Sequence, residues 1–344
     1  MEQLSIDYML PADVSFPPSL KRVAVVNNMP EIPDNQLINT DKAPKDDTEL
    51  ARKVDYYNGD AKITTEALAE ALAHENYFNE VVICDSALRA HDITPRESTL
   101  TRTEVNQLIN DLDVDFLIAL ENIQMRATRK IGYISDWGTY YGTVDVKVFP
   151  TLKVYLPNRK GPMVTINSTD SIFWEEFGGS DSYVRSRLIK EKDLISEASE
   201  FAGTVPVKRL LPYWKTAGRY LFTGGSVNMR DAAVYVREKQ WDKAIELWER
   251  VYAAKKSKQK MQAAYNIAVG YEMQDSISTA YDWALKAQAE ARKVEKIDEK
   301  DLSHLDRADL PYYVLTTLYA VELQDRKDGL SRLNMQMQRF KDDF

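Results

Sequence analysis

Few residues that could carry chemistry lie close together in this 344-residue sequence. The three histidines, His74, His91 and His304, are far apart, and none has a second histidine or a cysteine three or four positions away. Metal sites usually take two ligands from such short spacings, so each histidine is interpreted as a surface residue. Cys84 is the only cysteine, which excludes an internal disulfide and a multi-cysteine zinc site. It follows the apolar residues 81–83, which favours a buried thiol with a structural role.

Two further patterns have simpler explanations than a ligand site. Asp111, Asp113 and Asp115 alternate, which would place three carboxylates on one side of an extended chain. They span the end of an expected helix and the start of an expected strand, so capping and turn roles are favoured over calcium binding. The Gly-Gly-Ser sequences at residues 178–180 and 224–226 lack the lysine of a phosphate-binding loop and are typical of turns.

The composition is ordinary for a soluble globular protein, with 44% hydrophobic and 28% charged residues. The formal net charge of −8 argues against general nucleic-acid binding, because phosphate contacts need a basic surface. No stretch approaches the roughly 20 apolar residues that span a bilayer. We therefore expect no catalytic residues, no metal, no cofactor and no nucleic-acid partner.

Residues 1–223 are predicted to form an α/β domain. Apolar and alternating runs predict strands at residues 5–10, 22–26, 81–84, 116–120, 144–155 and 163–174. Helices are predicted from Thr64 or Thr65 to residue 76, from Thr103 onward, and at residues 183–201. The polar residues 30–60 predict a long surface loop. Strands and helices that alternate before a final hairpin predict an α+β fold, an α/β sandwich with a mixed sheet.

Residues 224–344 are predicted to be entirely helical, after a boundary at the Gly-Gly-Ser sequence of residues 224–226. Helices are expected at residues 227–238, 241–254, 259–273, 279–294, 310–324 and 329–340, which would form three pairs. A further helical piece is expected just before the boundary, at residues 213–222. The highly charged residues 295–309 predict a loop.

The helical tail contains an internal echo. Ala232, Tyr235 and Ala244 recur 36 residues later as Ala268, Tyr271 and Ala280. Small and aromatic residues that repeat at such a period indicate stacked helical hairpins, which usually bind other proteins. The sequences at residues 241–245 and 265–271 resemble the tetratricopeptide repeat, whose usual period is 34. The longer period is assigned to a longer loop at residues 255–259.

This resemblance implies a concave face lined by the first helix of each pair. Asn266 then occupies the position at which peptide-binding repeats often place an asparagine that contacts the ligand backbone. Arg230 occupies the matching position one repeat earlier, and Arg237 lies two turns beyond it. These three residues are the candidate partner-binding residues. Alternatively they are solvated polar positions, because two or three repeats give only a shallow groove.

Segments of the first domain resemble a bacterial cell-envelope pattern. They are residues 22–28 (Arg-Val-Ala-Val-Val-Asn-Asn), the helix around residues 68–72, residues 77–84, and residues 113–120 (Asp-Val-Asp-Phe-Leu-Ile-Ala-Leu). The pattern is similar to the α/β domain of the curli-secretion lipoprotein and to the amino-terminal domain of the Tol-system propeller protein. Both domains in this order resemble an uncharacterised lipoprotein family, a domain of unknown function, of Bacteroides-type bacteria. That resemblance implies a lipidated cysteine before residue 2, absent from this sequence, and attachment to the outer membrane.

The favoured hypothesis is a non-enzymatic envelope lipoprotein that docks a protein partner through its helical repeat. One alternative is a glycan-acting envelope enzyme that uses Glu175 or Glu176 beside Trp174, although no second carboxylate is identifiable across a site. The other alternative is a cytosolic scaffold protein. The Asp-Ser-Ala or Asp-Ser-Ile sequences at residues 85–87, 170–172 and 275–277 match the O-glycosylation pattern that the resemblance implies.

Overall fold

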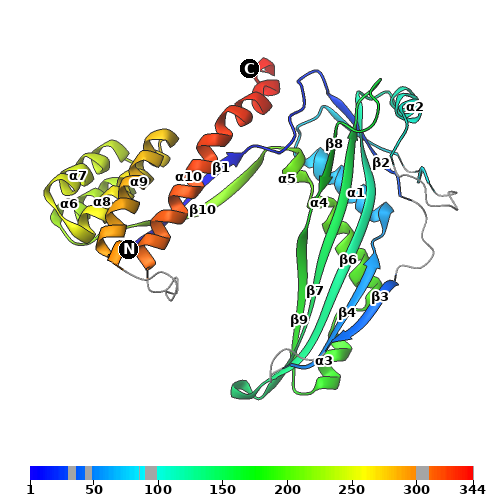
Figure 1. Ribbon diagram of the computed structural model, residues 1–344, viewed down its shortest axis with the longest axis horizontal. Coiled ribbons are helices and arrows are strands. Elements are labelled where there is room, and N and C mark those ends of the chain that lie inside the picture. The colour runs from blue at the N-terminus through cyan, green and yellow to red at the C-terminus, as the bar shows by residue number, and fades with distance from the viewer. Residues whose placement is uncertain (30–35, 43–48, 85, 90–98, 300–309, 344) are drawn as a thin grey trace. The chain divides into compact units, whose positions relative to one another are not determined.

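The computed structural model describes residues 1–29, 36–42, 49–84, 86–89, 99–299 and 310–343 (Figure 1). The chain divides into two compact units. The sheet unit is Ala12–Leu211, and the helical unit is Met1–Pro11 together with Pro212–Phe344. The sequence placed a single boundary between residues 223 and 224. The structure places residues 1–11 and 212–223 with the helices instead, because strands from these two segments pair with each other.

The sheet unit is built on a mixed sheet, as the sequence predicted, with eight strands within the described residues. The strand order is β3 (Gln36–Lys42), β4 (Glu49–Asn58), β6 (Phe116–Ile134), β2 (Arg22–Asn27) and β5 (Glu80–Cys84). β7 (Thr139–Tyr155) also pairs with β6, and β8 (Val164–Asn167) and β9 (Asp170–Gly178) pair with β7. β2 runs parallel to β5 and β6, whereas the other pairings are antiparallel.

Two predictions about this sheet are corrected. The polar residues 30–60, predicted to be a loop, contain β3 and β4, while residues 30–35 and 43–48 lie outside the described residues. β4 forms because its Val54 and Tyr57 are buried in the sheet unit despite their polar neighbours. The strand predicted at residues 163–174 is two strands, separated where the Ser168 N–H donates to the Pro150 carbonyl at 3.0 Å.

Helices cover both faces of the parallel strands. α1 (Ala61–His74) packs on one face of β2 and β5. On the other face α2 (Arg102–Leu112) buries Val105 and Ile109 against Ala24 and Leu117. The βαβ connections of a parallel sheet place helices on both of its faces, so parallel strands are buried on both sides. α3 (Asp181–Arg187) and α4 (Glu191–Thr204) lie against the longer antiparallel strands, and α5 (Val207–Leu210) follows (Figure 1).

The helix starts lie earlier than the sequence predicted. The Asp60 carboxylate caps α1 by accepting from the first backbone N–H groups, so Thr64 and Thr65 lie inside the helix. Thr101 caps α2 and forms a capping box with Glu104. The helix predicted at residues 183–201 is two helices, α3 and α4, which are separated at residues 188–190.

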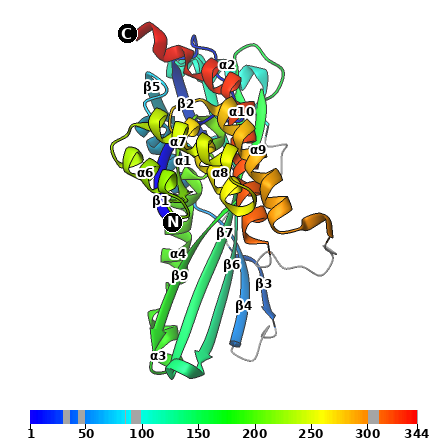
Figure 2. The same cartoon turned by 90° about the vertical axis from the view of Figure 1, so that its left-hand side faces the viewer.

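The antiparallel strands have one face without a helix, named here the open face. In β7, Val144, Val146 and Val148 are fully buried, and neighbouring Gly142 lies against α3. Alternate residues of a strand point to opposite sides, so Thr143 and Asp145 lie on the open face. None of the described helices of the sheet unit covers this face (Figures 1 and 2).

The helical unit begins with a two-stranded ribbon. β1 (Glu2–Leu10) pairs antiparallel with β10 (Tyr213–Leu221) along its whole length. The predicted strand at residues 5–10 is therefore confirmed, whereas the helix predicted at residues 213–222 is wrong. Within β10, Ala217, Arg219 and Leu221 are buried and the residues between them are exposed, which is the period of two that a half-buried strand shows.

The sequence repeat of 36 residues corresponds to two successive helical hairpins in the structure. α6 (Val227–Arg237) and α7 (Trp241–Ala254) form one hairpin, and α8 (Ser257–Glu272) and α9 (Ile277–Val294) form the next. The four alanines of the repeat, Ala232, Ala244, Ala268 and Ala280, are all fully buried. Both turns place a non-glycine residue at positive φ, Lys239 at 58° and Asp275 at 57°. In both turns the N–H of the next residue donates to a tyrosine carbonyl, at 2.8 Å for Tyr235 and 2.9 Å for Tyr271.

The predicted third pair of helices is corrected. α10 (Pro311–Gln336) is one helix that continues through Gly329, where the sequence suggested a break between two. A Cβ placed at Gly329 would lie 3.0 Å from Pro11 Cγ, so this glycine allows Pro11 to approach the helix closely.

A buried charge cluster joins the ribbon to α8 and α10. Fully buried Glu272 of α8 accepts two hydrogen bonds from Arg219 of β10, at 2.7 and 2.8 Å. On α10, the Tyr319 hydroxyl donates to the same carboxylate at 2.7 Å, and Arg326 also binds it. Burial opposes the charge of Arg219, but its bonds to Glu272 outweigh burial and raise its pKa. We call Glu272, Arg219, Arg326 and Tyr319 the Glu272 cluster.

We predict that Glu272→Ala destabilises the protein strongly. Removing the carboxylate leaves two buried arginines without their shared partner, and breaking a buried pair in this way costs about 3–5 kcal/mol. Glu246→Ala is the matched control, because its pair with Arg250 is exposed and is worth less than about 1 kcal/mol. Urea unfolding measures both free energies. Equal free energies of unfolding in the two variants would contradict the role of the cluster.

Glu322 predicts a pH dependence of stability. Burial raises its pKa, but the Tyr8 hydrogen bond and the Arg219 charge outweigh burial, so the pKa is lowered. A lowered pKa gives stability that is present above the unfolded value of about 4.3 and is lost as the pH falls through the folded value. We expect the free energy of unfolding to fall less steeply below pH 5 in Glu322→Gln than in wild type. Glu246→Gln should keep the wild-type slope, and identical slopes in all three proteins would contradict the prediction.

Candidate functional site

Asn266 was predicted to contact the backbone of a ligand. In the structure it contacts the backbone of its own chain. It is fully buried on α8. Its Oδ1 accepts from the Phe222 N–H at 2.9 Å, and its Nδ2 donates to the Phe222 carbonyl at 2.7 Å. Asn266 is therefore neither a solvated polar position nor free to bind a ligand, because the Phe222 backbone occupies its amide. Both amide groups are used within the chain, so Asn266 is not accessible to an external ligand.

The two arginine candidates lie at the surface. Arg230 is exposed on α6, and Arg237 is exposed near the end of the same helix. Arg237 forms an ion pair with Glu2 of β1. The structure thus brings Arg237 to the ribbon and does not join either arginine to Asn266 in one site.

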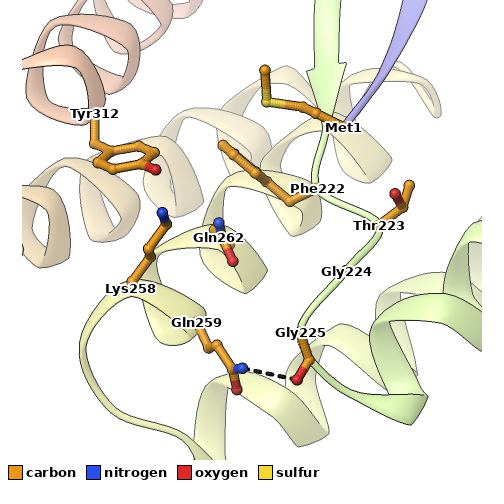
Figure 3. Close-up of a pocket in the computed structure, with 9 residues that line it drawn as sticks. All are labelled: Met1, Phe222, Thr223, Gly224, Gly225, Lys258, Gln259, Gln262 and Tyr312. Carbon is orange, nitrogen blue, oxygen red and sulfur yellow. Dashed lines mark hydrogen bonds between the residues drawn. The ribbon is translucent and has the colours of Figure 1, made fainter.

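A pocket of about 610 Å³ opens beside the segment that Asn266 holds (Figure 3). It lies where the residues after β10 pass the first turns of α8 and α10. Its lining residues are Met1, Phe222, Thr223, Gly224, Gly225, Lys258, Gln259, Gln262 and Tyr312. The volume is in the usual range for ligand sites, and the walls are mainly apolar with a few polar groups, as such sites require.

The polar groups of this pocket come mainly from one face of α8. Gln259 donates from Nε2 to the Gly225 carbonyl at 2.9 Å. The Lys258 ammonium lies 4.7 Å from the centre of the Tyr312 ring. Gln262 lies between Gln259 and Asn266 along the helix and is only partly buried. Its amide has no hydrogen-bond partner among the described residues, so it is available to a ligand in the pocket.

The other residues that the sequence singled out have structural positions. His74 is exposed, whereas His91 and His304 lie outside the described residues. Cys84 is partly buried, and its thiol lies 3.8 Å from the Ser86 carbonyl. Across the described residues, no group of three or more histidine, cysteine or acidic side chains could hold a metal ion. None of the described helices is long and apolar enough to cross a membrane.

Two of the three alternating aspartates, Asp113 and Asp115, have the capping and turn roles that the sequence predicted. Asp113 has a left-handed conformation at the end of α2 and pairs with Arg22. The Asp115 carboxylate accepts from the backbone N–H groups of Lys21 and Arg22, at 2.7 and 2.8 Å. Asp111 is exposed.

The carboxylates of the enzyme alternative do not face each other. Glu175 lies on the open face of β9, and Glu176 follows it on the opposite side of the strand. Trp174 lies on the same side as Glu176 and donates from Nε1 to Glu197 of α4 at 3.1 Å. The two adjacent glutamates therefore cannot act on one bond.

A buried polar network was missed by the sequence analysis. Glu121 accepts from the Tyr155 hydroxyl at 2.7 Å and from Asn28 Nδ2 at 3.0 Å, and Lys153 lies 3.6 Å away. Burial is the main cause that raises the pKa of Tyr155. Ligands often bind at the carboxyl ends of parallel strands, where this network lies. Its members satisfy one another, and they hold β6 at the irregularity between Leu120 and Asn122.

Two family models match the chain. A domain of unknown function, DUF8603, matches residues 20–222, and a second domain of unknown function, DUF6340, matches residues 230–325. No curated protein and no solved structure matches. The first match contains β10, which belongs to the helical unit, and the second begins within α6.

We predict that Asn266→Ala destabilises the fold by about 1–3 kcal/mol, because it leaves the buried Phe222 N–H and carbonyl without partners. Gln259→Ala, the matched control, removes one bond at an exposed edge and should cost less than about 1 kcal/mol. Thermal unfolding followed by circular dichroism compares the two. A wild-type melting temperature in Asn266→Ala would show that the Phe222 bonds do not stabilise the unit.

Proposed function

The chain belongs to the family of the domain of unknown function DUF8603, and we propose that it is a non-enzymatic protein-interaction module. In this proposal the pocket of the helical unit holds a segment of a partner protein. The observation that carries it is Gln262, an amide without a partner among the described residues, beside a backbone that the same helix already holds.

The three amides of α8 support an extended peptide as the ligand. Gln259, Gln262 and Asn266 are spaced three and four residues apart, so they share one helix face. The outer two bind the backbone of residues 222–225. Gln262 lies between them and offers a donor and an acceptor at the same spacing. A partner strand that enters the pocket could therefore bond to Gln262 as Phe222 bonds to Asn266.

The remaining walls define the side chains of that peptide. Phe222 and Tyr312 present aromatic surface, and Met1 adds an apolar thioether (Figure 3). Lys258 places one positive charge at the rim, over the Tyr312 ring. These groups favour a segment with a large apolar residue close to an acidic one.

The chemistry of the chain supports binding over catalysis. The polar side chains of the pocket are one lysine, one threonine, one tyrosine and two glutamines, and none of them is a carboxylate, histidine or cysteine. Acid–base and nucleophilic catalysis most often use a carboxylate, a histidine or a cysteine, and a lysine, threonine or tyrosine acts as nucleophile only when a neighbouring group activates it. The 36-residue hairpins support a tetratricopeptide-like repeat, and such repeats commonly bind proteins.

We propose further that the protein works at the cell envelope, anchored to the outer membrane as a lipoprotein. The support for this location is the resemblance of residues 22–28 and 113–120 to envelope proteins. These segments lie in the sheet unit, and the resemblance is likewise to α/β domains.

Selection of a displayed peptide library against the full chain tests the binding proposal. Kd values of the selected peptides are measured by fluorescence anisotropy. We expect Lys258→Ala/Gln262→Ala to weaken binding at least tenfold, because it removes the free amide and the rim charge. Lys243→Ala/Gln338→Ala removes the same side-chain types from exposed positions outside the pocket and should change Kd less than twofold. Equal affinity in the pocket variant, or failure to select any peptide, would contradict the proposal.

A further inference from the structure

The open face of the sheet unit contains a hollow of about 450 Å³ on β4, β6, β7 and β9. The lining residues that matter here are Arg126, Lys147, Asp145, Glu175, Thr128 and Phe173. The volume lies within the range of small-ligand sites. Adjacent strands are about 4.8 Å apart, so the four strands offer roughly 14 Å of surface across the sheet. We call this site the sheet hollow.

The register places like charges directly opposite each other in the sheet hollow. Arg126 of β6 faces Lys147 of β7. Like charges at directly opposed positions destabilise a sheet. No ion pair within the described residues joins Arg126 or Lys147 to a carboxylate, and the Nε of Arg126 is buried without a hydrogen-bond partner. A bound anion would reduce the repulsion between Arg126 and Lys147.

The sheet hollow also contains groups that a simple anion would not satisfy. Asp145 lies opposite Thr128, and Glu175 lies opposite Thr143. The two carboxylates can only accept hydrogen bonds, so the ligand must carry donors as well as negative charge. Phe173 lies opposite Asp145 with 65% of its surface exposed, and it offers an apolar ring face in the middle of these polar groups.

From these groups we infer that the sheet hollow binds an acidic saccharide, a short glycan that carries carboxylate groups. The sugar carboxylates pair with Arg126 and Lys147, its hydroxyls donate to Asp145 and Glu175, and one ring face packs on Phe173. An acidic peptide also supplies negative charge and N–H donors, but it lacks the closely spaced hydroxyl donors and the ring face that a sugar offers to Asp145, Glu175 and Phe173. This site lies in the sheet unit and is independent of the peptide pocket of the helical unit.

Isothermal titration of the full chain with tetragalacturonate tests the inference, with neutral maltotetraose and hexaglutamate as comparison ligands. We expect tetragalacturonate to bind, to weaken as NaCl is added, and to bind at least tenfold more weakly to Arg126→Gln/Lys147→Gln. Neither comparison ligand should bind as tightly. Phe173→Ala should weaken tetragalacturonate at least threefold, because it removes the ring under the sugar.

Arg159→Gln/Lys160→Gln is the matched control, since it removes the same charges from exposed positions outside the sheet hollow and should change affinity less than twofold. Arg126→Gln/Lys147→Gln removes a like-charge pair, so the melting temperature of this variant should not fall. A loss of binding in this variant is then not caused by unfolding. The inference is overturned if tetragalacturonate gives no binding to wild type, if the Arg126/Lys147 variant binds equally well, or if hexaglutamate or maltotetraose binds as tightly as tetragalacturonate.

Discussion

The helical unit depends on one buried carboxylate. Glu272 lies on α8, yet its partners come from β10 and α10, so the three elements must be in place together. A buried charge without its partners is costly, and this cost links ribbon and helices into one cooperative structure. The cluster also fixes the register of β10. A slip by one residue would turn Arg219 to the other face of the ribbon and leave Glu272 without its bidentate partner.

The helical hairpins could be predicted from the sequence because their determinants are local. Ala232 and Ala268 mark close helix contacts, and the period between them is visible in the residues themselves. The ribbon could not be predicted in this way. The apolar pattern of residues 213–222 fits a helix and a strand equally well. These residues form a strand because they pair with β1, which lies far away in the chain. Asn266 shows the same limit at the site, since its partner, Phe222, was not foreseen.

On the open face, a clear sequence pattern predicts the strands but does not reveal which side chains face each other across them. The alternation of Thr143, Asp145 and Lys147 predicts a strand with one buried face. The pairing of Lys147 with Arg126 is set by the turn at Ser135–Trp137, because the register of β6 and β7 is regular from that turn to Asn122. A turn longer or shorter by one residue would change which side chains meet across β6 and β7.

The pairing of β1 with β10 makes the sheet unit an insertion within the helical unit, and this sets an order of events during synthesis. Asp7 and Thr216, which bond across the ribbon, are 209 residues apart. At translation speeds of about 5–20 residues per second, β1 leaves the ribosome on the order of ten seconds or more before its partner exists. The sheet unit can fold in that interval, while β1 waits as an unpaired strand. Acidic residues such as Glu2 and Asp7 discourage an unpaired strand from joining other chains, so they protect the nascent protein until β10 arrives.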